Sequence, residues 1–95
     1  MYIVIFKATL KSLDENYYQT AERMRELALN VYGCVQIDSV CDGKQEITLS
    51  YWQSEEAIHE WKNNPEHLRA QKMGVSQWYE SYQVEVVELD RHYGS

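Results

Sequence analysis

The sequence predicts an α+β domain in which a four-stranded antiparallel sheet carries its helices on one face. Apolar, β-branched runs open and close the chain, and two further strand-like runs flank Asp42-Gly43 in its middle. Stretches with helical spacing of apolar residues separate these groups. A chain of 95 residues has room for one hydrophobic core, so we expect a single domain over residues 1–95, with a polar tail at 91–95.

The first strand is expected at Tyr2–Leu10, where nearly every residue is apolar or β-branched and both faces are therefore expected to be buried. A helix follows, because Ser12-x-x-Glu15 is a capping-box pattern, with Asp14 as an alternative cap. Its apolar stripe, best explained as core, comprises Tyr17, Ala21, Met24, Ala28 and Val31. Gly33 is expected to close this helix as the C′ residue.

The middle of the chain predicts a hairpin. The residues of Cys34–Cys41 alternate loosely, Asp42-Gly43 is a turn signal, and Glu46–Trp52 is the partner strand. Cys34 and Cys41 are seven positions apart, roughly 23 Å along an extended strand, which is too far for a disulfide. We therefore expect two reduced cysteines.

The next segment predicts two short helices. Ser54, followed by two glutamates, is expected to cap a helix that carries Ala57, Ile58 and Trp61 on one side. Asn64-Pro65 then begins a second helix, since Asn favours the N-cap and Pro the first helical position.

The last strand is expected at Trp78–Leu89, after a helix that ends near Met73 with Gly74 as its stop. The resulting β-α-β-β-α-β order is that of the ferredoxin-like fold, with the helices on one face of the sheet. Neither the first nor the last strand alternates cleanly, so the second face is expected to be apolar too. The helices cannot cover both faces, and we therefore expect a homodimer formed through the sheet.

Composition excludes several classes of function. A net charge of −6 and a pI near 4.9 argue against nucleic acid as a partner, because phosphate binding needs clustered Lys and Arg. No segment approaches the roughly 20 apolar residues of a membrane span, and the first residues lack a signal-peptide pattern. We expect no membrane partner and a cytoplasmic location. No metal-ligand spacing, glycine-rich phosphate loop or Ser/His/Asp grouping is visible, so no metal site is expected.

An aromatic ring, several amides and an imidazole converge only in Trp61–Gln71. This segment overlaps a longer run, YW-x-S-x-E-A-x-x-x-W-x-x-x-P-x-H over Tyr51–His67, which resembles the antibiotic biosynthesis monooxygenase family. The order of elements and the Gln77-Trp78-Tyr79 opening of the last strand support the resemblance, which covers essentially the whole chain. It implies a dimer of ferredoxin-like subunits whose sheets close into a shared α+β barrel.

Some members of this family degrade haem, with an Asn on the first strand, a Trp on the second long helix and a His further on as the iron ligand. Trp61 matches the Trp, but Gln71 stands where the His would fall, and Tyr2–Leu10 contains no Asn. An amide is a poor ligand for haem iron. His67 is the alternative ligand, one helical turn earlier. We expect no haem degradation and no cofactor.

The resemblance also implies cofactor-free oxygenation of a small electron-rich aromatic, such as a quinol or polyphenol. This chemistry needs a base, donors for an oxyanion and an apolar cavity that excludes water. His67 is the expected base, since an unperturbed imidazole titrates near neutrality. The expected donors are Trp61, Asn63, Asn64 and Gln71, and the expected cavity walls are Phe6, Trp78, Tyr79 and Tyr82. Of these, His67, Trp61 and Asn64 are the catalytic candidates.

Each candidate also has a structural explanation. Asn64 could be no more than an N-cap, His67 a packing residue and Trp61 a core residue. His59 is expected in solvent and His92 in the tail. A second class of function therefore stays open. It is a dimer of the same fold that binds a small molecule, or only packs well, without catalysis.

Overall fold

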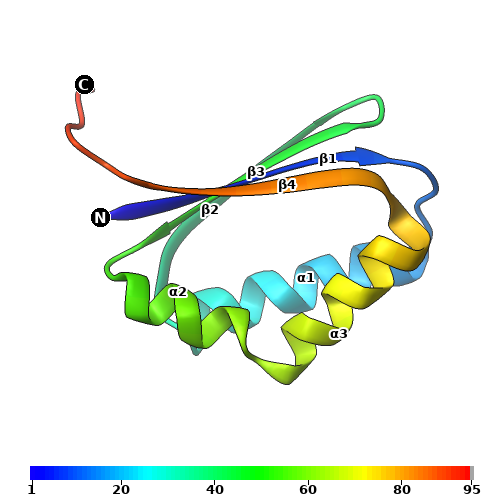
Figure 1. Ribbon diagram of the computed structural model, residues 1–95, viewed down its shortest axis with the longest axis horizontal. Coiled ribbons are helices and arrows are strands. Elements are labelled where there is room, and N and C mark those ends of the chain that lie inside the picture. The colour runs from blue at the N-terminus through cyan, green and yellow to red at the C-terminus, as the bar shows by residue number, and fades with distance from the viewer. Residues whose placement is uncertain (95) are drawn as a thin grey trace.

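The computed structural model describes residues 1–94 of the chain. Its elements are β1 (Tyr2–Leu10), α1 (Glu15–Asn30), β2 (Cys34–Asp42), β3 (Gln45–Trp52), α2 (Glu55–Lys62), α3 (Pro65–Met73), a π-helical turn η1 (Gly74–Trp78) and β4 (Tyr79–Glu88). The strand order is β2-β3-β1-β4, and all neighbours are antiparallel. The helices lie on one face of the sheet (Figure 1). The α+β class and the ferredoxin-like order are confirmed.

The helix starts follow the cap signals in the sequence. Asp14, Ser54 and Asn64 precede α1, α2 and α3, and each side-chain oxygen accepts a hydrogen bond from the backbone N–H three residues on, at 2.9, 3.1 and 3.0 Å. These bonds satisfy one of the N–H groups that the first turn of a helix leaves without a partner. Asp14, the alternative cap, therefore begins α1 in place of Ser12.

Two glycines follow the ends of α1 and α3. α1 ends at Asn30 with Val31 as its cap, so the C′ residue is Tyr32 and not the predicted Gly33. Gly33 is the next residue, and its φ of +81° turns the chain into β2. Gly74 has a helical φ of −58°, and the chain continues through η1 to Trp78. The predicted end of this helix near Met73, with Gly74 as its cap, is confirmed, and the π-helical turn follows it directly.

Close packing explains why residue 74 is a glycine. A Cβ at this position would lie 2.4 Å from Cε2 of the Tyr79 ring. Gly74 is itself buried, so a larger side chain has no room there. The glycine lets the Tyr79 ring pack directly against the backbone of η1, which sets how β4 begins.

The centre of the core lies between the sheet and the helices. Ala28, Cys34 and Trp52 are buried there, and Ile58 and Trp61 of α2 pack against them. Trp52 is completely buried. Both cysteines are free, Cys34 buried and Cys41 exposed, so the expected absence of a disulfide between them is confirmed.

The opposite face of the sheet carries no helix (Figure 1). The strand register and the alternation of side chains place an apolar set on it: Ile3, Ile5, Val40, Ile47, Leu49, Tyr51 and Val87. Val40 is 66% exposed, Val87 41% and Ile47 40%. The chain alone therefore leaves an apolar sheet face in contact with solvent. None of the helices in residues 1–94 combines the length and the hydropathy needed to cross a membrane.

Candidate functional site

The junction of α2 and α3 brings an indole and an imidazole together. Trp61 lies in the last turn of α2 and His67 in the first turn of α3, and the chain changes direction before Pro65. The two rings stack, with centroids 4.4 Å apart and planes at 19°. The Trp61 ring also contacts Trp52 at 6.4 Å and Tyr32 at 5.3 Å between centroids. The His67 ring is therefore held on the core side of α3.

The surroundings of His67 favour the neutral form of its imidazole. Burial lowers its pKa below the ordinary value of 6.5, and the charge of Lys62 acts in the same direction. The backbone carbonyls of Trp61 and Lys62 act in the opposite direction, but Nδ1 is buried and forms no hydrogen bond within residues 1–94. A neutral imidazole keeps one nitrogen lone pair, so this ring can accept a proton at neutral pH.

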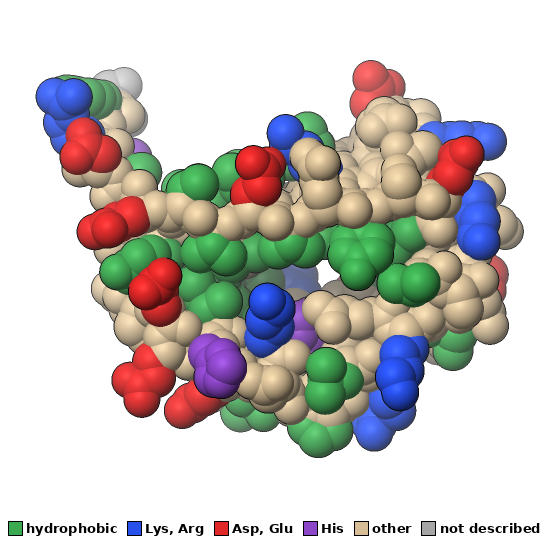
Figure 2. Space-filling model, viewed as in Figure 1, with side chains coloured by type: hydrophobic (Ala, Val, Ile, Leu, Met, Phe, Trp, Pro, Cys, Tyr) green, Lys and Arg blue, Asp and Glu red, His purple; other side chains and the backbone are tan. Residues whose placement is uncertain are grey.

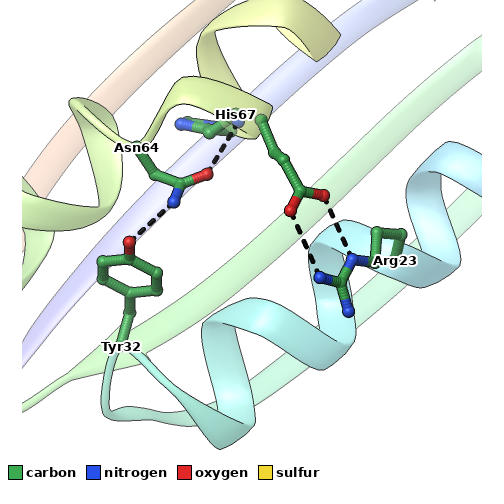
Figure 3. Close-up of polar contacts among 5 residues, drawn as sticks. Arg23, Tyr32, Asn64 and His67 are labelled. Carbon is green, nitrogen blue, oxygen red and sulfur yellow. Dashed lines mark hydrogen bonds and ion pairs between the residues drawn. The ribbon is translucent and has the colours of Figure 1, made fainter.

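Asn64 connects this ring pair to the rest of the fold. Its Oδ1 accepts the backbone N–H of His67, and its Nδ2 donates to the Tyr32 hydroxyl at 2.6 Å. Figure 3 shows the Asn64 side chain lying between Tyr32 and the first turn of α3. The interpretation of Asn64 as an N-cap is confirmed, and both ends of its amide are engaged.

The other two amides lie further out. The Nδ2 of Asn63 donates to the His59 carbonyl at 2.9 Å and lies 3.2 Å from that ring's Nε2, so this exposed side chain belongs to the end of α2. Gln71 follows His67 by one helical turn and therefore lies on the same side of α3. Gln71 is exposed.

Figure 2 shows a hollow between β4 and the helices α2 and α3, with hydrophobic side chains along its sheet side. Val84 and Val86 pair with Phe6 and Val4 of β1, and Val4 packs on the core, so this row of side chains faces the helices. Tyr82, Val84 and Val86 are nonetheless 51%, 44% and 48% exposed. The helices thus cover this edge of the sheet incompletely.

The predicted wall residues fall into two places. Phe6, Tyr79 and Tyr82 form one cluster, with ring centroids 5.3 to 6.1 Å apart. Trp78 packs instead against Tyr17 of α1, at 5.3 Å and edge to face, and is 3% exposed with no partner for its Nε1 within residues 1–94. Trp78 also borders a surface groove between α1 and α3.

A carboxylate that the sequence reasoning passed over lies near this aromatic cluster. The Tyr17 hydroxyl donates to one oxygen of Glu46, and the Thr48 hydroxyl donates to the other at 3.2 Å. Burial, and next the hydrogen bond to Glu46, raise the pKa of Tyr17. Burial and the charge of Glu46 raise the pKa of Tyr79 to about 12. The alternation of β3, which places Glu46 on the same face as Trp52, was the signal available in the sequence.

Within residues 1–94, no three His, Cys, Asp or Glu side chains come together as a metal site would require. Gln71, at the position that the resemblance assigns to a haem ligand, presents only an amide. The expectation of no cofactor stays a prediction.

A ferredoxin-like sheet with a stacked Trp and His at the α2–α3 junction fits the resemblance seen in the sequence. The model of the antibiotic biosynthesis monooxygenase family matches residues 1–73, and the chain belongs to this family. It is 45% identical over 92 residues to a protein of Bacillus subtilis (strain 168) named "Uncharacterized protein YqjZ", across 95% of this chain and 80% of that relative.

Solved structures share the fold. SnoaB from Streptomyces nogalater, a cofactor-independent oxygenase, superposes with a TM-score of 0.82 at 8% identity, over 99% of this chain and 97% of SnoaB. Rv0793 from Mycobacterium tuberculosis gives a TM-score of 0.78 at 15% identity, over 98% of each chain. At these identities the likeness concerns the fold alone.

Proposed function

We propose that this protein is a cofactor-independent monooxygenase that oxidises a small electron-rich aromatic, such as a quinol or polyphenol, in the hollow between the sheet and the helices. Membership of the family supports the class of reaction, and the shared fold of a named cofactor-independent oxygenase is in line with it. One observation of this chain carries the proposal. It is the half-buried His67 imidazole, which stacks on Trp61 and whose buried Nδ1 has no hydrogen-bond partner within residues 1–94.

In the proposed reaction, neutral His67 accepts the proton of a substrate hydroxyl. The phenolate gives one electron to O₂, and the resulting substrate radical and superoxide combine at a ring carbon, with a proton, to form a hydroperoxide. The O–O bond then breaks as water leaves, and the carbon becomes a carbonyl. One oxygen atom enters the product and one becomes water. The substrate supplies every electron, so phenol and O₂ give quinone and water.

The remaining side chains take supporting roles in this proposal. Trp61 fixes the His67 ring by stacking, and its Nε1, together with the Gln71 amide, is the proposed donor to the phenolate oxygen. Phe6, Tyr79 and Tyr82 form the proposed apolar wall, while Trp78 packs separately against Tyr17. Asn64 acts by holding the start of α3, and Asn63, engaged with His59, has no role.

Oxygen uptake tests the proposal. Protein treated with a chelator is mixed with quinols, naphthols and anthrones in an oxygen-electrode cell, and the rate of each compound alone is subtracted. We expect uptake with at least one compound, loss of uptake in His67→Gln and no change in His59→Gln, a matched variant of an exposed histidine. Binding without uptake for every compound would favour the non-catalytic alternative.

We also propose that the bare apolar face of the sheet pairs with the same face of a second copy. That face is apolar on both sides of a two-fold contact, which is what an isologous interface requires. Sedimentation should give a dimer at micromolar concentration, and Ile47→Lys should give a monomer. Leu68→Lys adds the same charge on exposed α3 and should leave the dimer intact. A monomeric wild-type protein would contradict this proposal.

The extent of the domain and its location are proposed on the sequence alone. Residues 1–90 are expected to resist limited proteolysis as one unit, with cleavage confined to the tail at 91–95. A cytoplasmic location is expected in cell fractionation. Early cleavage inside an element, or recovery with membranes, would contradict these two expectations respectively.

A further inference from the structure

Tyr32 lies far in sequence from the α2–α3 junction, but both its aromatic ring and its hydroxyl contact the junction. It stands in the turn after α1, where the positive φ of Gly33 brings the chain round into β2. Its ring lies 5.3 Å from Trp61, and its hydroxyl accepts the Nδ2 of Asn64 at 2.6 Å. The sequence reasoning gave Tyr32 no role.

The geometry of Asn64 makes this contact directional. Its Oδ1 must face the N–H of His67, because an amide nitrogen there would oppose another donor. Its Nδ2 is thereby turned toward Tyr32, as Figure 3 shows. One planar amide thus fixes the distance between the Tyr32 hydroxyl and the first turn of α3.

A second contact, the ion pair between Arg23 of α1 and Glu66 of α3, also holds α3 but is weaker than the Asn64–Tyr32 hydrogen bond. Arg23 forms two hydrogen bonds with Glu66, at 3.1 and 3.2 Å (Figure 3). The two side chains are 53% and 36% exposed, and an ion pair in water typically contributes only about 0–1 kcal/mol. The half-buried hydrogen bond from Asn64 to the Tyr32 hydroxyl is therefore the better candidate for fixing α3.

We propose that Tyr32 is a positioning residue, which holds the His67 ring on Trp61 by fixing Asn64 at the start of α3. This inference rests on the proposed function insofar as His67 is the base. His67 is the third residue of α3, so any rotation of the first turn moves its ring directly. Tyr32 itself does not need to touch the substrate.

The test uses Tyr32→Phe, which keeps the ring against Trp61 and removes only the hydroxyl. The imidazole proton resonances of His67 are followed by NMR across pH, a readout that needs no activity. We expect the pKa of His67 to rise toward its ordinary value as the ring becomes less firmly buried. We also expect kcat on an accepted phenol to fall by about tenfold with KM little changed. Tyr18→Phe, on an exposed tyrosine, is the matched control and should change neither.

A second variant separates positioning through Asn64 from a general effect. Asn64→Ser keeps a capping hydroxyl but removes the amide that reaches Tyr32. In that background Tyr32→Phe should have no further effect on the pKa of His67. An unchanged pKa in Tyr32→Phe, or an equal shift in both backgrounds, would overturn the inference. A third outcome separates the two proposals. If Tyr32→Phe shifts the pKa of His67 only when residue 64 is asparagine, and the protein consumes no oxygen, the positioning role is supported and the proposed function is not.

Discussion

Two groups of polar and aromatic side chains lie at opposite ends of β3, on its helix-facing side. The His67 cluster consists of Tyr32, Trp61, Asn64 and His67 and packs on Trp52, the last residue of β3. The Glu46 cluster consists of Tyr17, Glu46, Thr48 and Tyr79, and Glu46 is the second residue of the same strand. Both clusters combine a titratable group with aromatic rings, but their hydrogen bonding differs.

In the Glu46 cluster, each carboxylate oxygen accepts a hydroxyl. In the His67 cluster, a buried ring nitrogen has no partner within residues 1–94. Leaving a buried polar atom unsatisfied costs about 1–3 kcal/mol, which a fold tolerates where a ligand completes the bond. Trp78 Nε1 likewise has no partner in the described part of the chain, but an indole N–H cannot accept a proton. From this contrast we propose a structural role for the Glu46 cluster and a chemical role for the His67 cluster.

The largest expected effect is on turnover. His67→Gln should lower the rate of oxygen uptake by about 10²–10⁴-fold, the range expected for loss of a general base. The free energy of unfolding should change by less than about 1 kcal/mol, because no hydrogen bond of the ring nitrogen Nδ1 is lost. Kinetics and urea denaturation measure the two quantities on the same preparation. Unchanged turnover would mean that His67 is not the base and that the substrate ionises by its own acidity, with the amides as donors to the phenolate.

Stability should respond most at the other end of the sheet. Gly74→Ala places a methyl group against the Tyr79 ring and should lower the free energy of unfolding by about 1–3 kcal/mol. Gln77→Ala, at an exposed position of η1, should cost no more than about 0.5 kcal/mol. Equal stability of the two variants in urea would mean that the ring moves aside without cost.

Removing one donor from the Glu46 cluster should have a somewhat smaller effect. Tyr17→Phe leaves one oxygen of Glu46 without its donor and should lower the free energy of unfolding by about 1–2 kcal/mol. Tyr18→Phe, at a tyrosine that is 58% exposed, serves as the control. Oxygen uptake should persist in both variants. A Tyr17→Phe protein that is fully stable but inactive would reverse the assignment of the two clusters.

The smallest expected effect is a pH dependence of stability. The pKa of His67 is lowered in the folded chain, so the unfolded chain binds its proton more readily. Stability from this group is present above the unfolded value of 6.5 and is lost as pH falls through the folded pKa. Between about pH 7 and pH 5, wild type should therefore lose more stability than His67→Gln. Equal losses in denaturation experiments would indicate that the ring is not buried in solution.

Local signals predicted the fold well. The helix caps Asp14, Ser54 and Asn64 bond to backbone only three residues further on, so they were visible in the sequence. The turn at Gly43 was visible as well, because it requires only a residue that adopts a positive φ. The end of α3 at Gly74 was visible too, but the packing of the Tyr79 ring against this glycine was not, because that contact depends on the tertiary structure.

The candidate site was harder to predict for the same physical reason. Trp61 and His67 are near in sequence, and one short junction brings them together. Tyr32 meets Asn64 across 32 positions, and Tyr17 meets Glu46 across 29. Hydrogen bonds of this kind depend on how the helices sit on the sheet, which periodicity and capping do not specify.

Isotope labelling tests the central claim most directly, namely that His67 prepares a substrate for O₂ without a cofactor. Chelator-treated protein is incubated under ¹⁸O₂ with an accepted phenol, and the product is examined by mass spectrometry. The proposed reaction predicts a quinone with one labelled oxygen from wild type, and none above the protein-free blank from His67→Gln. Product without label, or equal labelled product from both proteins, would contradict it.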